Sequence, residues 1–202
     1  MGQNVTDLHV EVPDATPLTP SERNGLKQAW VSTRHDLNQA EQDNILKGMN
    51  WASRLRDKQT AALLNTEFTC QLHRRMFGDV WTWAGNYRKS ERNLGIVAQR
   101  IAEEVAQMLK DVAYWVEHKS YDSDEICIRL HHRLVYIHPF ANGNGRHSRL
   151  MADLLSERLS NTRFSWGGET LINASELRSS YIAALKVADN NNIQPLLLFA
   201  RS

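Results

Sequence analysis

The sequence predicts an all-α protein with one non-helical segment. Through most of the chain, apolar residues recur at the three- and four-residue spacing of an amphipathic helix. The boundaries between these stretches carry helix-start and helix-stop residues such as Ser, Asn, Gly and Pro. Residues 78–97 lack that spacing, and Trp81, Trp83 and Tyr87 alternate there, which favours an ordered loop or a short β-hairpin.

The N-terminal part is predicted to be an extended arm followed by two helices. Residues 1–20 hold three of the five prolines and show little periodicity. A helix is expected to begin at Pro20 and to run as far as Val31. After a break, a longer helix is expected over residues 37–56, and a polar joint follows at 57–59.

The remaining helices are predicted from apolar stripes that face one side. Pro139 ends one of these helices, because a proline disfavours helical backbone at the residue before it. We expect helices over residues 60–77, 99–118, 123–137 and 144–159, a turn at 165–168, a helix capped by Asn173 or Ser175, and a short helix at 196–200.

The charge balance excludes some classes of function. The 202 residues include 24 Lys and Arg against 23 Asp and Glu, a formal net charge of +1. This argues against a nucleic-acid coat protein and a polybasic membrane binder. No apolar run reaches the length of a membrane span, and Cys70 and Cys127 form no metal or disulfide pattern. We therefore expect a cytoplasmic protein that binds neither membranes nor nucleic acids directly.

Residues 138–149 stand out because a glycine-punctuated loop separates two predicted helices. Gly143 and Gly145 permit backbone conformations that side chains forbid, and the N–H groups at a helix start bind anions. Arg146 and Arg149 lie three residues apart, so both can reach a phosphate from one helix face. The stretch therefore predicts a cradle for polyphosphate.

Three more residues of this stretch have predicted roles. His138 lies at the rim, where it can accept a proton near neutral pH. Phe140 is expected to anchor the loop in the core, and Asn142 offers a carbonyl oxygen to a phosphate-bound Mg²⁺. Each feature alone has a plainer explanation: an ordinary turn, a structural histidine before proline, a solvated pair of arginines.

Together these residues resemble the Fic family signature, HPFx[D/N]GNGRxxR. Every position is matched, by His138, Pro139, Phe140, Asn142, Gly143, Asn144, Gly145, Arg146 and Arg149. Residues 77–88 are similar to the stretch leading into the family's flap, and the likeness covers roughly residues 60–200. The whole chain looks most like the branch called mobile mystery protein B. The resemblance implies a Fic-type helical bundle with a short β-hairpin flap.

Fic proteins are mostly adenylyltransferases that move AMP from ATP to a Ser, Thr or Tyr hydroxyl of a protein. The resemblance implies that His138 takes the hydroxyl proton, and that Gly143, Asn144, Gly145, Arg146 and Arg149 hold the phosphates of ATP. Mg²⁺ is implied too, although Asn142 brings no charge where an acid is common. The target protein would pair with the flap, whose candidate residues are Arg88, Lys89, Ser90, Glu91, Arg92 and Asn93.

Many Fic proteins are inhibited by a helix with the motif [S/T]xxxE[G/N], which places a Glu against the second signature arginine. Here Asp36 stands at the Glu position of such a spacing, and Glu41 lies one turn later without the Ser or Thr. Three alternatives stay open: one of these acids reaches Arg149, both are solvated helix-start acids, or a separate antitoxin-like partner inhibits. Residues 1–59 would form the N-terminal arm and helices, and residues 60–202 the Fic domain.

Two other functions compete with AMP transfer. The same fold can catalyse phosphorylation or the transfer of another nucleotide, and a non-enzymatic module could respond to nucleotides and regulate a DNA-binding neighbour. The intact Gly-Asn-Gly sequence favours AMP transfer. The expected partners are a protein with a reactive hydroxyl and, by auto-AMPylation, the chain itself.

Overall fold

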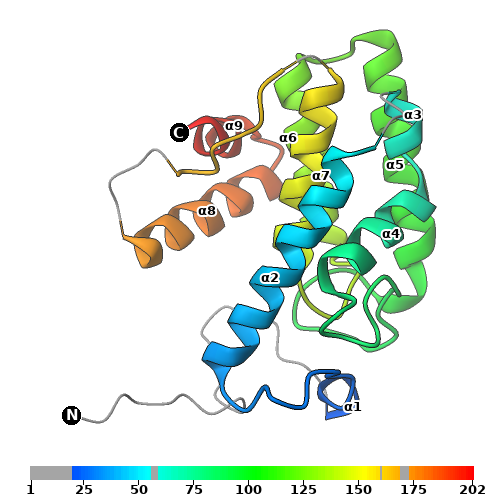
Figure 1. Ribbon diagram of the computed structural model, residues 1–202. Helices are drawn as coiled ribbons and strands as arrows, with labels where there is room; N and C mark the ends of the chain where they lie inside the picture. Colours follow the sequence, from blue (N-terminus) through cyan, green and yellow to red (C-terminus); the bar gives the residue numbers. More distant parts are fainter. Residues whose placement is uncertain (1–19, 56–58, 160, 169–172) are drawn as a thin grey trace.

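The computed structural model describes residues 20–55, 59–159, 161–168 and 173–202. The elements in chain order (Figure 1) are α1 Pro20–Arg23, α2 Arg34–Ser53, α3 Thr60–Leu63, α4 Thr66–Phe77, η1 Ala98–Arg100, α5 Ile101–His118, α6 Ser123–Ile137, α7 Asn144–Arg158, α8 Ala174–Asp189 and α9 Gln194–Arg201. Every regular element in these ranges is a helix, which confirms the all-α prediction. The predicted arm, apart from Pro20, lies outside the described residues.

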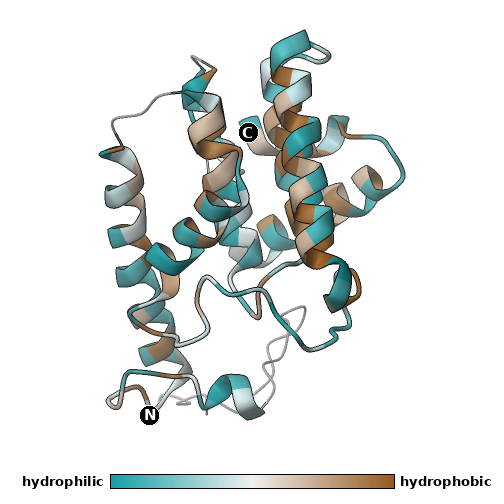
Figure 2. Ribbon diagram, turned by 90° about the vertical axis from the view of Figure 1, so that its right-hand side faces the viewer, coloured by the Kyte–Doolittle hydropathy of each residue, from teal (hydrophilic) through white to brown (hydrophobic). Residues whose placement is uncertain are grey.

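The helices α6 and α7 pack along each other, α5 and α9 pack on α6, and α2 packs on α4. The helices carry hydrophobic and hydrophilic residues side by side (Figure 2), and many of the apolar residues are buried in one core cluster. The core includes Leu72, Val105, Leu134, Leu154 and Leu196, all fully buried. In the described part of the chain, no helix combines the length and apolar character needed to cross a bilayer.

Several predicted helix boundaries are confirmed. The helices α5, α6 and α7 match the predicted segments to within two residues. Asn173 caps α8 by accepting hydrogen bonds from the N–H groups of Ser175 and Glu176. Both cysteines are free, as expected.

Three predicted helices differ in extent. The helix expected over residues 37–56 is α2, which begins three residues earlier because Thr33 caps it, and ends at Ser53. The helix expected to run from Pro20 to Val31 stops at Arg23, because the chain then pairs with another segment. Lys27 N–H donates to the Val80 carbonyl at 2.8 Å, and Leu26 forms an antiparallel bridge with Trp81. In a longer helix, the backbone groups of Leu26 and Lys27 would bond within that helix and could not pair with residues 80–81.

The helix expected over residues 60–77 is split into α3 and α4 at Leu64 and Asn65. The Asn65 side chain accepts a hydrogen bond from the Phe68 N–H at 2.8 Å, so it acts as the N-cap of α4. Asn at this position competes with the helical backbone for hydrogen bonds and favours a new start.

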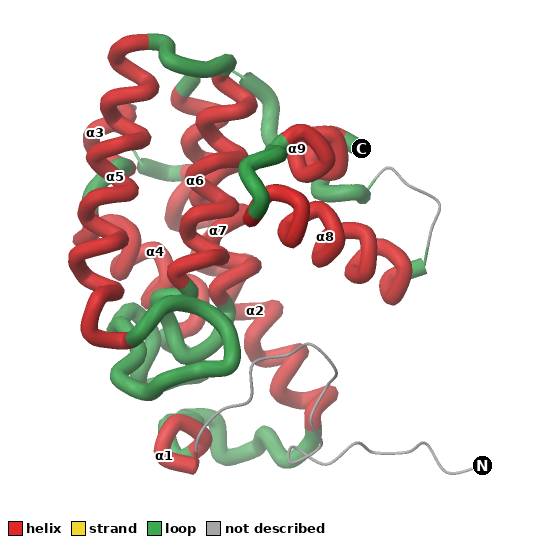
Figure 3. The backbone as a smooth tube through the Cα atoms, turned by 180° about the vertical axis from the view of Figure 1, so that it is seen from behind, coloured by secondary structure: helices red, strands yellow, loops and turns green. Residues whose placement is uncertain are grey.

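Residues 78–97 form an ordered loop, shown in green at one end of the helices in Figure 3. The β-hairpin implied by the resemblance is not formed in this described segment. Two of its backbone N–H groups donate to the chain at and just after the end of α6: Arg88 N–H to the Pro139 carbonyl at 2.9 Å, and Ile96 N–H to the Ile137 carbonyl at 3.4 Å. These N–H groups of Arg88 and Ile96 are therefore not available for the strand pairing of a hairpin.

Three buried histidines predict a pH-dependent stability. Burial lowers the pKa of His131 to about 3 and that of His147 to about 4, and lowers the pKa of His73 well below its usual range. Because the unfolded chain binds these protons near pH 6.5, the free energy of unfolding should fall as pH decreases from about 6.5 to about 4. The expected slope reaches about 1.4 kcal/mol per pH unit for each histidine.

Urea unfolding between about pH 7.5 and pH 4.5 measures this slope. His147→Gln should reduce it, whereas His118→Gln, at an exposed histidine on α5, should leave it unchanged. An equal slope in the wild type and in His147→Gln would contradict the assignment.

Candidate active site

The signature residues lie on the loop that joins α6 to α7. His138 adopts a left-handed conformation with φ of 54°, and its N–H donates to the Leu134 carbonyl at 3.0 Å, which ends α6. Gly143 has φ of 77° and caps α7. A Cβ at Gly143 would lie 2.5 Å from the Phe77 ring, so backbone conformation and packing both require glycine there.

The side chain of Asn144 closes this loop. Its Oδ1 accepts from the Phe140 N–H at 2.9 Å, and its Nδ2 donates to the Phe140 carbonyl at 2.8 Å. The buried side chain of Asn144 shapes the loop, so the group that this residue can offer to a phosphate is its backbone N–H at the start of α7. A Cβ at Gly145 would meet no atom within 4 Å, so open space lies over this helix start.

A layer of buried rings supports the loop from below. His73 donates from Nε2 to the Asn142 carbonyl at 3.0 Å, accepts at Nδ1 from the Gly85 N–H at 3.0 Å, and stacks on Phe140 with ring centroids 3.7 Å apart. His147 donates from Nε2 to a carbonyl of α4 and meets the Phe140 ring edge-on. Phe140 is fully buried beneath the loop and contacts both histidine rings.

His73 is a supporting residue that the sequence analysis missed. Its only sequence signal is a polar residue on the apolar side of the helix 66–77. Its role depends on two backbone groups that lie 12 and 69 residues further along the chain.

His138 is half-buried, and its ring orientation is defined by the backbone. Nδ1 lies 3.3 Å from the Val135 carbonyl, which can only accept, so the proton is placed on Nδ1 and the lone pair on Nε2. Burial lowers the pKa of His138 to about 4, with smaller contributions from the charges of Arg88 and Arg92. The ring is therefore neutral at pH 7, the state that a proton acceptor requires.

Arg88, a predicted docking residue, is buried and ties the long loop to His138. Its Nε donates to the His138 carbonyl at 2.7 Å, its Nη1 donates to the Ser90 carbonyl at 2.9 Å, and its Nη2 donates to the Ile96 carbonyl. A Cβ at Gly95 would lie 2.5 Å from the Cβ of His138, so this loop packs directly on the candidate base. The guanidinium group fixes the loop and the end of α6 relative to each other.

The other predicted docking residues differ in exposure. Lys89 and Asn93 are exposed, and Glu91 accepts from the Ala98 N–H at 2.9 Å. Ser90 Oγ donates to Glu22 Oε1 at 3.0 Å, and Arg92 forms an ion pair with the same carboxylate. A residue of α1 thus holds the middle of the candidate flap.

The two signature arginines have different partners. Arg146 pairs with Glu41 of α2, with Nη2 and Oε2 2.8 Å apart, and its guanidinium lies over the Phe77 ring. Glu41 is buried, and its other oxygen accepts from Trp81 Nε1 at 2.8 Å. Arg149 lies over the rings of Tyr181 and Trp166.

The expectation that Asp36 or Glu41 reaches Arg149 is therefore wrong for the described residues. Glu41 contacts Arg146, three residues earlier, and Asp36 caps its own helix. Asp36 Oδ2 accepts from the N–H groups of Thr33 at 2.9 Å and Ser32 at 3.1 Å, and these bonds lower its pKa. The spacing that resembled an inhibitory motif forms a capping box at the start of α2.

Comparison with known proteins identifies relatives of this fold and sequence. The model of the Fic/DOC family matches residues 63–156. The chain is 31% identical over 133 residues to protein adenylyltransferase fic-1 of Caenorhabditis elegans and, over the same length, to protein adenylyltransferase Fic of Drosophila virilis. These matches cover 64% of this chain but only 25% and 26% of the relatives. The chain thus spans about a quarter of their length.

Solved structures show the same fold. A fragment of Fic-1 from C. elegans superposes with a TM-score of 0.62 at 23% identity, covering 88% of this chain and 56% of that one. The BepC protein of Bartonella tribocorum, solved with bound AMPPNP, gives a TM-score of 0.66 at 16% identity, covering 91% and 97%.

Arg88→Lys is expected to lower the free energy of unfolding by about 2–4 kcal/mol. A lysine cannot donate to the separate carbonyls that the guanidinium bonds, and buried acceptors are left unpaired. Urea unfolding of Arg88→Lys and of the neighbouring exposed control Lys89→Met measures the difference. A loss of similar size in both variants would show that Arg88 has no special role.

Proposed function

Because the chain is a Fic/DOC family protein, we propose that it transfers AMP from ATP to a Ser, Thr or Tyr hydroxyl of a protein. The proposal depends on the state and place of His138. This histidine is neutral at pH 7 with the lone pair on Nε2, and it lies on the loop that leads into the open start of α7. The names of the relatives, protein adenylyltransferases, support it. Membership of the mobile mystery protein B branch stays part of the proposal.

The reaction requires one proton transfer and one substitution at phosphorus. The target hydroxyl gives its proton to Nε2 of His138, its oxygen bonds to the α-phosphorus of ATP, and the bond from that phosphorus to the bridging oxygen breaks. Pyrophosphate leaves with the bonding electrons. The proton placed on His138 Nδ1 by the Val135 carbonyl keeps Nε2 in the accepting form.

The phosphates would be bound by the start of α7. The first N–H groups of a helix have no partners within it, and the helix dipole favours an anion there. The open space at Gly145 leaves room for phosphate oxygens. Arg146 and Arg149 would neutralise the charge that builds on the leaving pyrophosphate.

The fit of this site to Mg²⁺ is modest. Asn142 is the predicted ligand, and its Oδ1 already accepts from the Gly143 N–H at 2.7 Å, which leaves one lone pair for a metal. Mg²⁺ is usually held by carboxylates together with substrate phosphates. An ion bound here would be held largely by ATP, and it would supply positive charge to the phosphates.

The contact between Glu41 and Arg146 supports a proposal of inhibition from within the chain. Arg146 is half-exposed, whereas the carboxylate of Glu41 is buried. An arginine that already pairs with a carboxylate binds a phosphate less well, because the two anions compete for one guanidinium. The N-terminal helix α2 would thus lower the affinity for ATP.

His138→Ala is expected to lower AMP transfer at least about 100-fold, because the target hydroxyl loses its base. Transfer is measured with ATP labelled at the α-phosphorus, on a lysate and on the chain itself. The exposed His118→Ala is the control. Unchanged labelling by His138→Ala would contradict the role of His138, and label that follows only the γ-phosphorus would indicate phosphorylation.

Glu41→Gln is expected to tighten ATP binding by up to about tenfold, or about 1.4 kcal/mol. The amide removes the competing charge but keeps an oxygen for the Trp81 bond. Calorimetric titration with ATP measures the affinity, and Asp43→Asn, at an exposed acid of the same helix, is the control. Weaker binding by Glu41→Gln would show that the pair supports the site instead of blocking it.

A further inference from the structure

Arg149 is surrounded by aromatic rings instead of carboxylates. Its guanidinium carbon lies 4.4 Å from the centre of the Tyr181 ring and 5.7 Å from that of Trp166. Within the described residues no ion pair joins Arg149 to an acid, and its buried Nε has no hydrogen-bond partner. Arg146, in contrast, pairs with Glu41.

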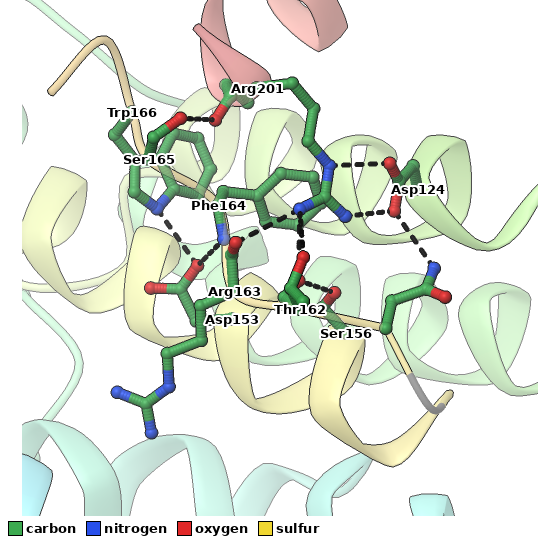
Figure 4. A network of polar contacts seen from close by, with 11 residues as sticks. Asp124, Asp153, Ser156, Thr162, Arg163, Phe164, Ser165, Trp166 and Arg201 are labelled. Carbon is green, nitrogen blue, oxygen red and sulfur yellow. Dashed lines mark hydrogen bonds and ion pairs between the residues drawn. The ribbon is translucent and has the colours of Figure 1, made fainter. Parts of the chain in front are cut away.

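The Trp166 ring is held in place by its own bonds. Its Nε1 donates to Asp153 Oδ1 at 3.0 Å, as Figure 4 shows, and Asp153 lies one helical turn after Arg149 on α7. The backbone N–H of Trp166 donates to the Ala200 carbonyl at 2.9 Å. Trp166 has φ of 54°, a conformation that a bulky residue adopts only under constraint from its surroundings.

The segment that carries Trp166 is pinned from both sides. Arg201 of α9 donates from Nε to Asp124 Oδ2 at 2.6 Å and from Nη1 to the carbonyls of Thr162 and Arg163, each at 3.1 Å (Figure 4). Ser165 Oγ donates to the Ala200 carbonyl at 3.2 Å. The ring is thus attached to α6, α7 and α9 and has little freedom to move.

The Tyr181 ring is fixed by a neighbour on α6. Its hydroxyl lies 3.0 Å from His131 Nε2, and both side chains are buried. The lowered pKa of His131 keeps that imidazole neutral at pH 7, so it does not repel the nearby guanidinium. Tyr181 and Trp166 both lie beyond residue 156, where the family match ends.

Rings and carboxylates hold a guanidinium with different consequences. A carboxylate cancels the positive charge and competes with a phosphate for the same N–H groups. An aromatic face attracts the cation through its quadrupole and leaves its net positive charge available to an anion. The Tyr181 hydroxyl also forms a hydrogen bond with Arg149. A cation held in this way is preorganised to bind an anion.

We propose that Trp166 and Tyr181 are positioning residues that hold Arg149 ready for the terminal phosphate of a bound polyphosphate. Residues 162–168 and 173–202 are then part of the site and not only of the fold. This inference rests on the proposed function for the identity of the natural ligand, but its test does not require AMP transfer.

The test measures the affinity of the full chain for inorganic tripolyphosphate by calorimetry. Trp166→Leu and Tyr181→Leu each remove one aromatic ring from Arg149, whereas Trp166→Phe and Tyr181→Phe keep an aromatic ring at that position. Arg149→Ala is the reference for loss of the cation. Phe164→Leu is the matched control, because that ring lies over Arg201 in the same segment. Melting temperatures identify any variant that fails to fold.

Each Leu variant should bind tripolyphosphate about 3- to 10-fold more weakly, approaching Arg149→Ala, while the Phe variants and Phe164→Leu stay within about twofold of the wild type. Wild-type affinity in both Leu variants or in Arg149→Ala overturns the inference, and so does an equal loss in Phe164→Leu. If the wild type transfers no AMP while this pattern holds, the proposed reaction fails and the positioning role stands.

Discussion

The site depends on the paired hydrogen bonds between the Asn144 amide and the backbone of Phe140. They close the turn between α6 and α7, so that one helix ends at the candidate base, His138, and the next begins six residues later, at Asn144. The turn can close only because Phe140 is buried against His73 and because Gly143 leaves room for Phe77. Breaking buried hydrogen bonds of this kind is costly, since the donor and the acceptor would each be left unpaired away from water.

The two signature arginines share a helix face but differ in how they are held. Arg146 is half-exposed and paired with a buried acid, and Arg149 lies over two rings. At Arg146 a phosphate must displace the carboxylate of Glu41, whereas the positive charge of Arg149 is not neutralised by its rings and stays available to a phosphate. Such a division would let one arginine respond to the N-terminal helix while the other provides a constant binding group.

The N-terminal elements are joined to the site at several points. Glu22 of α1 contacts the long loop at Ser90 and Arg92, and Glu41 of α2 reaches both Trp81 and Arg146. The predicted boundary near residue 60 separates these acids from their partners in sequence, but the fold brings them into contact. Movement of α1 would therefore change the contacts of the long loop, and movement of α2 would change those of Arg146.

The sequence by itself determined the all-α class, the boundaries of α5 to α7 and the place of the signature, because helical periodicity, caps and glycine turns are local properties. It could not decide that Glu41 contacts Trp81 and Arg146, or that backbone N–H groups of the loop 78–97 donate to carbonyls at the end of α6. Those outcomes depend on which buried groups meet across 40 or more residues. Only the packed structure decided them, because each buried charge and backbone group must find a partner among the residues that folding places beside it.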